Sequence, residues 1–331
     1  MRDTHGIGGA RLGPRLSGGN VNVTRLVESD AGRLVLRHAP AETVSEKAAA
    51  GIEREFRIVE ALTGVARVPR AVGYCSDASI IGAPFALTAF VDGTAISTEL
   101  PAPYANDPAT IDRIGEELVD ALAEVHVADW KARLPAGFGK PQNFVRRQVE
   151  RWTAIREADA VRDLPLMRDL AGWLLENLPP EGPAAIVHND YHLDNTLFDT
   201  DAPRLNAIID WEMGAVGHPM IDLGLVLMFW GRPDRADLGF GFVQKVSNRP
   251  GVVSARALAE RWSARTGFDS GALDYFRCLA FWRLAAMVEG AYGLYRRGQV
   301  DTPYARRLEA DVPALLREAA ALIDGSTRED R

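Results

Sequence analysis

The residues whose types and spacing suggest chemistry lie in one segment, at positions 186–199, which reads IVHNDYHLDNTLFD. Asp190 and Asn195 are five residues apart in a polar loop that follows an apolar run, and Asp210 ends the next apolar run. Transfer of a phosphoryl group to a hydroxyl needs a carboxylate that accepts the hydroxyl proton and oxygen ligands that hold Mg²⁺ beside the phosphates. The spacing therefore predicts Asp190 as the catalytic base and Asn195 and Asp210 as metal ligands.

Two other interpretations of this segment stay open. An isolated H-x-D-x-x-x-x-N match is also compatible with an ordinary polar loop. A metallohydrolase site could include His188, Asp190 and His192, but zinc sites use three or four ligands, and His218 is the only further histidine nearby. We expect His188 to be buried and bonded to backbone, and His192 to be a surface residue of the loop.

The first part of the chain contains the elements expected to hold a nucleotide. Residues 15–37 are predicted to form three strands, with a glycine turn after the first and a hairpin turn at 29–32. A helix is predicted over 45–62, and two further extended runs occur at 71–75 and 84–91. This pattern indicates a small antiparallel sheet with one helix.

Glu55 falls on the apolar face of that predicted helix. A carboxylate on a buried face is costly unless it is paired, and the expected partner is Arg37, which closes the strand LVLR. In kinases a base that is paired with a helix glutamate holds the ATP phosphates, so both residues are predicted to bind the nucleotide. The alternative is a glutamate that turns out to solvent. The apolar face consists of Ile52, Phe56, Val59 and Leu62.

The glycine turn between the first two strands is a second candidate for contacting phosphates. It contains Ser17, Gly18, Gly19 and Asn20. Backbone N–H groups of such a turn can point at phosphate oxygens, although two adjacent glycines are also typical of an ordinary hairpin.

The rest of the chain has mainly helical patterns. Asp107 followed by Pro108 predicts a helix start with the aspartate as N-cap, and long helical patterns cover about 271–297 and 303–323. We predict an α+β fold with a β-rich N-lobe at residues 1–92 and a larger α-helical C-lobe at residues 93–331. The N-lobe would bind the nucleotide, and the C-lobe would hold the catalytic loop, the metal site and the acceptor pocket.

Composition excludes several classes of protein. The chain has 331 residues, a net charge of −7 and two cysteines, and it lacks both an overall basic excess for nucleic acid and an apolar stretch long enough for a membrane helix. Residues 181–230 hold eight acids and one base, as a site for divalent cations would need. We expect a cytoplasmic enzyme with reduced thiols and a small-molecule partner, without nucleic acid or membrane.

Several segments together resemble the aminoglycoside phosphotransferase-like kinase family, from about Leu12 to Arg297. The matching segments include LSGGNVN, LVLRH, HNDYHLDN, IIDWEMGAVGHPMIDLG and FWRLAAMVEGAYGLYRRG. The chain is most similar to the branch of this family that is associated with acyl-CoA dehydrogenases. The resemblance implies a bilobal protein-kinase-like fold, ATP as the phosphoryl donor with GTP as an alternative, and Mg²⁺.

The resemblance also implies roles for individual residues. Thr88, Ala89 and Phe90 match the hinge whose backbone binds the adenine edge, and Asp222 matches an aspartate that steadies the catalytic loop. The chain departs from the family at Asn189, where glycine is usual and a left-handed backbone is expected, which Asn tolerates better than most residues. It also lacks the usual acidic hinge residue, because Ala89 stands there.

The acceptor is the part of the reaction that the sequence specifies least. From residue 241 onward, fourteen bases face eleven acids, which favours a neutral or anionic hydroxyl compound over a polycationic antibiotic. A hydroxyacyl thioester of coenzyme A is one such acceptor. The alternative to an enzyme is a nucleotide-binding pseudokinase that acts as an interaction module, although the intact Asp190, Asn195 and Asp210 argue against it.

Overall fold

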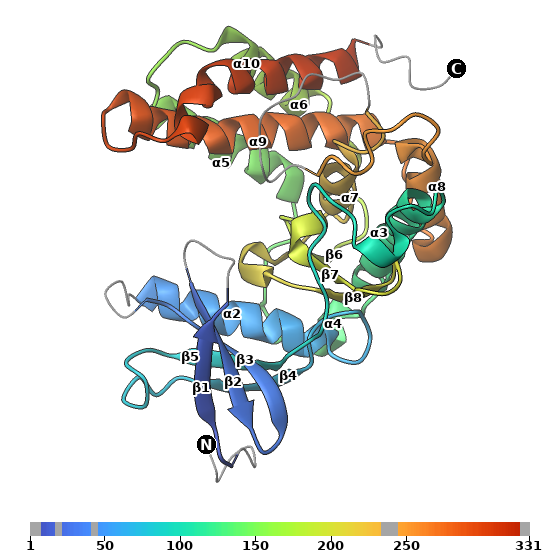
Figure 1. Cartoon of the computed structure of the whole chain (residues 1–331). Helices are drawn as coiled ribbons and strands as arrows, with labels where there is room; N and C mark the ends of the chain where they lie inside the picture. The colour runs from blue at the N-terminus through green and yellow to red at the C-terminus, as the bar shows by residue number, and fades with distance from the viewer. Residues whose placement is uncertain (1–7, 17–21, 41–45, 233–243, 325–331) are drawn as a thin grey trace.

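The computed structural model describes residues 8–16, 22–40, 46–232 and 244–324, which form a β-rich lobe and a helical lobe (Figure 1). The β-rich lobe contains a five-stranded antiparallel sheet in the order β1-β2-β3-β5-β4. The sheet consists of β1 (Arg11–Arg15), β2 (Val23–Ser29), β3 (Gly32–His38), β4 (Ala71–Cys75) and β5 (Phe85–Ala89). The predicted sheet is confirmed, except that β1 begins earlier than expected.

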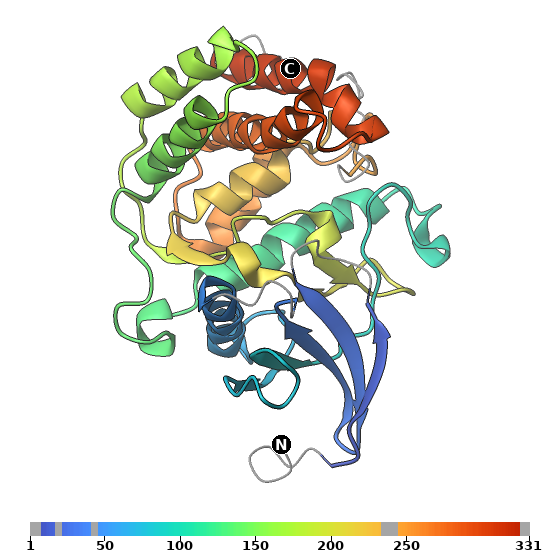
Figure 2. The ribbon, with the colours of Figure 1, turned by 90° about the vertical axis from the view of Figure 1, so that its left-hand side faces the viewer.

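Helix α2 (Glu46–Leu62) packs against both lobes. It lies alongside the sheet and next to the helical lobe in both views (Figures 1 and 2). Ile52 and Phe56 pack with Ala86 of the sheet, whereas Ile58 and Leu62 belong to the large core of the helical lobe. A displacement of α2 would therefore disturb the packing of both lobes.

The helical lobe is built around the long helix α9, which packs against α10, α7, α5 and α6. Its helices are α3 (Thr110–His126), α4 (Trp130–Arg133), α5 (Phe144–Ala158), α6 (Pro165–Glu176), α7 (Met220–Leu227), α8 (Ala255–Thr266), α9 (Leu273–Arg296) and α10 (Pro303–Ile323), with the 3-10 turn η2 (Ala102–Tyr104) before them. None of the helices among the described residues is long and apolar enough to cross a bilayer.

The predicted helix start at Asp107 is wrong by a few residues. Helix α3 begins at Thr110 with Ala109 at its N-cap position. The Asp107 carboxylate instead accepts the N–H of Ala109 at 2.9 Å, so Asp107 and Pro108 form a turn ahead of the helix. An Asx-type turn uses the same residue types as an N-cap, which is why the sequence did not separate the two.

Short strands between the lobes carry the polar loop. Strand β6 (Ala185–Val187) pairs with β9 (Ala215–Gly217), and β7 (Thr196–Phe198) pairs with β8 (Leu205–Ile208). The 3-10 turn η3 (Leu193–Asn195) forms the last part of the loop between β6 and β7. The 3-10 turn η4 (Trp211–Met213) follows β8. In Figure 1 these elements lie between the sheet and helices α9 and α10. The two apolar runs that precede the loop and Asp210 in the sequence thus form strands β6 and β8.

Candidate active site

Asp190 and Asn195 are in direct contact within the loop between β6 and β7. The amide nitrogen of Asn195 donates to the Asp190 carboxylate at 3.2 Å and to the Asp190 carbonyl at 2.8 Å. The Asp190 side chain is 44% exposed, whereas Asn195 is buried. Since its nitrogen is used in these bonds, the amide oxygen of Asn195 is the group that could face a cation.

The β7–β8 hairpin brings Asp210 next to Asn195. Thr196 pairs with Ile208, and the N–H of Ile209 donates to the carbonyl of Asn195 at 2.9 Å. Asp210 follows directly and adopts a left-handed backbone, with φ of 64°. The structure thus brings together all three residues that the spacing selected.

Asp222 holds the start of the loop through backbone hydrogen bonds. Its carboxylate, fully buried, accepts the N–H of His188 at 2.6 Å and that of Asn189 at 2.7 Å. Asn189 has φ of 65°, so the left-handed conformation expected there is confirmed. Its side chain adds a contact that glycine could not make, because the amide nitrogen donates to the carbonyl of Met213 at 3.0 Å.

His188 has a structural position, as predicted. Its Nε2 lies 2.8 Å from the carbonyl of Ile209, which can only accept, and its Nδ1 accepts the N–H of Asp190 at 3.3 Å. Burial lowers the pKa of this imidazole, which is consistent with a neutral ring. Both nitrogens are occupied, and no group of three metal-ligating side chains occurs among the described residues. The metallohydrolase interpretation therefore has no support.

His192 lies in the loop as predicted but is only partly exposed. The ring lies between two carboxylates, with Nε2 3.6 Å from Asp190 and Nδ1 3.4 Å from Asp194, and it is 33% exposed. Burial alone would lower its pKa, but the negative charges of the two nearby aspartates outweigh burial and raise the pKa to about 9. The hydroxyl of Ser97 in turn bonds to Asp194. Sequence spacing did not reveal this enclosure because Ser97 lies far from the loop in sequence.

Arg37 and Glu55 form the predicted ion pair. Arg37 Nε lies 3.1 Å from Glu55 Oε2, although the angle does not make a hydrogen bond, and the side chains are only 14% and 12% exposed. The Nη2 of Arg37 also contacts the carboxylates of Asp210 at 2.5 Å and Glu212 at 3.0 Å. The sequence analysis did not identify Glu212 as a site residue. The one signal for it was a second acid directly after Asp210 and Trp211.

Negative charge exceeds positive charge around Arg37. Burial raises the pKa of Glu55 to about 7, against the attraction of Arg37 and with help from Asp210 and Glu212. Burial likewise raises the pKa of Glu212. A divalent cation would compensate this excess, and the Asp210 carboxylate with the Asn195 amide oxygen is a donor set that suits Mg²⁺, which takes its remaining ligands from phosphates and water. The residues present therefore fit a magnesium ion.

The predicted adenine contacts lie at the end of β5. The N–H of Ala89 donates to the carbonyl of Arg70 at 2.8 Å, and that of Phe90 to the carbonyl of Arg33 at 3.0 Å. These two donors serve the sheet, so they are not available to an adenine edge. The hinge role of Thr88, Ala89 and Phe90 stays a prediction.

The glycine turn is the second predicted contact for the phosphates. Ser17, Gly18, Gly19 and Asn20 lie outside the described residues. Their predicted contact with phosphates therefore stays a prediction.

An apolar cavity of about 480 Å³ opens next to Asp190. It lies among α3, α7, α9 and α10. Among its described lining residues, Asp190 and His192 are the only groups charged at neutral pH, and most of the others are aliphatic or aromatic. The lining comprises Leu118, Asp190, His192, Leu193, Leu225, Val226, Met228, Phe229, Trp230, Gln244, Leu284, Met287, Val288, Ala291 and Tyr304.

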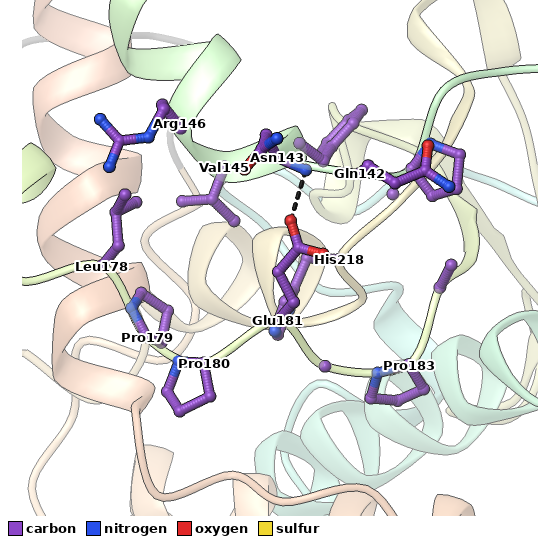
Figure 3. Close-up of a pocket in the computed structure, with 15 residues that line it drawn as sticks. Gln142, Asn143, Val145, Arg146, Leu178, Pro179, Pro180, Glu181, Pro183 and His218 are labelled. Carbon is purple, nitrogen blue, oxygen red and sulfur yellow. Dashed lines mark hydrogen bonds between the residues drawn. The ribbon is translucent and has the colours of Figure 1, made fainter.

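A second cavity, of about 190 Å³, lies away from these residues (Figure 3). Its lining includes Glu181, whose carboxylate accepts the N–H of Asn143, the residue before α5, at 2.5 Å. His218 also lines it, and burial lowers the pKa of that ring to about 4. None of the predicted site residues lines this cavity.

A double-mutant cycle tests whether Arg37 and Glu55 act as one unit. Replacing either residue by alanine is expected to raise the apparent ATP constant, and the double variant should be little worse than either single one, because each side chain depends on the other for its placement. Nucleotide titrations of the four proteins measure this. The neighbouring pair Arg57 and Glu60, 3.0 Å apart on the exposed side of α2, is the matched control. Fully additive effects at Arg37 and Glu55 would contradict the prediction.

Comparison with protein families gives a match over most of the chain. Residues 13–258 match the model of the phosphotransferase enzyme family. Acyl-CoA dehydrogenase family member 11 of Pongo abelii is 30% identical over 284 residues, which cover 85% of this chain. The same match covers only 36% of that protein, so the chain corresponds to about a third of its length.

Solved structures give the same fold. A Ralstonia eutropha protein described as a candidate aminoglycoside phosphotransferase superposes with a TM-score of 0.81 at 26% identity, covering 96% of this chain and 93% of that one. The GDP complex of aminoglycoside 2'-phosphotransferase-IIIa gives a TM-score of 0.60 at 16% identity, covering 95% and 93%. The second likeness concerns the fold alone. The predicted bilobal kinase-like architecture is confirmed.

Proposed function

The chain belongs to the phosphotransferase enzyme family, and on this premise we propose that it is an ATP- and Mg²⁺-dependent small-molecule kinase that phosphorylates a hydroxyl group. The family supports a kinase with a hydroxyl acceptor. The finer proposal depends on one observation, the convergence of Asp190, Asn195 and Asp210 beside Arg37.

Asp190 has the position and charge of a general base. Burial raises the pKa of this carboxyl, but the nearby charges, that of His192 first, outweigh burial, so its pKa lies below the ordinary value. An ionised carboxylate at the mouth of the cavity can accept the proton of an acceptor hydroxyl. The hydroxyl oxygen then bonds to the γ-phosphorus, the bond to the bridging oxygen breaks, and ADP leaves with the electron pair.

The nucleotide and the metal are assigned to the side of the site that faces the β-rich lobe. Asn195 and Asp210 would hold Mg²⁺, which neutralises phosphate charge during transfer. Arg37, oriented by Glu55, would contact phosphate oxygens, since its fork can grip a carboxylate and a phosphate together. ATP is proposed as the donor, and GTP is the alternative because a fold neighbour was solved with GDP.

The apolar cavity is proposed as the acceptor site, which favours a hydroxyl compound with an apolar body. Polycationic antibiotics need an acidic pocket, whereas the described lining here offers one carboxylate and many aliphatic side chains. The basic excess of the C-terminal helices is not an argument against polycationic acceptors, because arginines such as Arg261 and Arg297 pair with acids away from the cavity. A hydroxyacyl thioester of coenzyme A fits these features, and the name of the Pongo abelii relative is in keeping with acyl chemistry.

An acceptor comparison tests this proposal. At equal concentration and low salt, hydroxyacyl-CoA compounds are expected to release ADP from ATP, and kanamycin-type polyamines are not. Met287→Lys should raise the KM for the thioester at least about tenfold, because an ammonium group in an apolar cavity is costly. Leu294→Lys is the matched control, since Leu294 lies further along α9 and is equally exposed, at 39% against 37%. Efficient phosphorylation of the polyamines, with none of the thioesters, would refute the proposal.

A further inference from the structure

Arg283 is a buried arginine of helix α9 whose position the site described above does not explain. The residue is 5% exposed and lies in the mainly apolar helix stretch FWRLAAMV. Burying a guanidinium is unfavourable unless its donors are bonded and its charge is balanced. The hydrogen bond that Arg283 makes is directed at a backbone carbonyl, that of Asn189, at 2.6 Å.

That carbonyl belongs to the peptide group that joins Asn189 to the catalytic base. The N–H of the same peptide group, on Asp190, donates to His188 Nδ1 at 3.3 Å. Arg283 and His188 therefore hold the two ends of one peptide plane. Asn189 is in the left-handed region, with φ of 65°, where a non-glycine residue needs support from its surroundings. Rotation of this plane would move the Asp190 carboxylate.

The next turn of the same helix faces the apolar cavity. Leu284, Met287 and Val288 line that cavity together with Asp190. Residues three and four apart on a helix share a face, so Arg283 and Met287 lie one above the other on a rigid element. A ligand that fills the cavity contacts the helix that holds the base.

We propose that Arg283 is a positioning residue that couples the acceptor cavity to the catalytic base, by fixing the Asn189–Asp190 peptide to helix α9. This inference rests on the proposed kinase function in two respects, the assignment of Asp190 as the base and that of the apolar cavity as the acceptor site. Burial lowers the pKa of Arg283, and the negative charges of Asp190 and Asp222 on the loop side offset part of that effect.

Hydrogen exchange and kinetics test the coupling with two variants. Arg283→Met is expected to speed amide exchange in peptides that cover 188–195 by about tenfold or more, since it removes the anchor of the loop. With hydroxyoctanoyl-CoA positional isomers as acceptor probes, it should lower kcat about 10- to 100-fold, because small misplacement of a reacting group has effects of this size. The Kd for Mg-ADP should stay within about twofold. Arg283→Lys keeps the charge without the planar fork and should recover part of kcat.

Arg277→Met is the matched control, since Arg277 is also buried on α9 and pairs with Asp274 at 3.5 Å on the same helix. It should leave exchange at 188–195 unchanged. If Arg283→Met fails to fold, Arg283→Lys is measured in its place. Its kcat is expected to be several-fold lower, and amide exchange in the loop faster, than in the wild-type protein. Unchanged exchange and more than half of wild-type kcat in Arg283→Met, or equal effects in Arg277→Met, would overturn the inference. A wild-type protein that phosphorylates no alcohol would refute the kinase proposal, while the exchange result would still decide whether Arg283 anchors the loop.

Discussion

Replacing Asp190 by asparagine is expected to lower turnover at least about 100-fold while Mg-ATP binding stays nearly intact. A positioned general base contributes an effect of this size, and asparagine has almost the same shape but cannot take up a proton. The contact with Asn195, at 3.2 Å, can persist because the asparagine oxygen still accepts. ADP release measures turnover, and calorimetry measures nucleotide binding.

The control for this variant is Asp199→Asn, which removes a carboxylate just beyond the catalytic loop. Asp199 pairs with Arg204 at 2.6 Å and touches none of the predicted site residues in the described structure. Its turnover should stay close to wild type. An Asp190→Asn enzyme that keeps more than about half of its activity would contradict the assignment of the base.

Asp210→Ala is expected to act on nucleotide binding itself. The carboxylate is the charged member of the proposed metal site, and the metal bridges protein and phosphates. We expect ATP affinity in excess Mg²⁺ to fall at least about tenfold, or about 1.4 kcal/mol. Without Mg²⁺, the variant and the wild type should bind ATP about equally. Titrations with and without the metal measure both quantities.

The variant Glu212→Ala shows whether Asp210 acts by binding the metal or by placing Arg37. Glu212 contacts the same Nη2 of Arg37, at 3.0 Å, that Asp210 contacts at 2.5 Å. If Asp210 acted only by placing Arg37, both variants would lose affinity alike, with and without Mg²⁺. Equal ATP affinity of Asp210→Ala and wild type in excess Mg²⁺ would show that the metal assignment is wrong.

The sequence by itself selected the residues of the proposed site. The interval from Asp190 to Asn195 and the position of Asp210 after an apolar run are local patterns, and the strand–loop–hairpin that follows from them places the three together. The helical period put Glu55 on a buried face, where only a paired carboxylate is stable, and the ion pair with Arg37 confirms that inference. The left-handed backbone at Asn189 was predicted from the family resemblance instead, because glycine is usual at that position and asparagine tolerates the same conformation.

Only the tertiary structure decided how these residues are connected. Arg37 reaches Asp210 and Glu212 across 173 and 175 residues of sequence, and Arg283 reaches the loop across 94. The net charge from residue 241 onward did not describe the cavity, because the described lining is mainly apolar. Sequence patterns report backbone preference and burial, which are local properties. Which side chains meet, and which cavity they enclose, depends on how distant helices pack, since packing energy is shared among many contacts that spacing does not record.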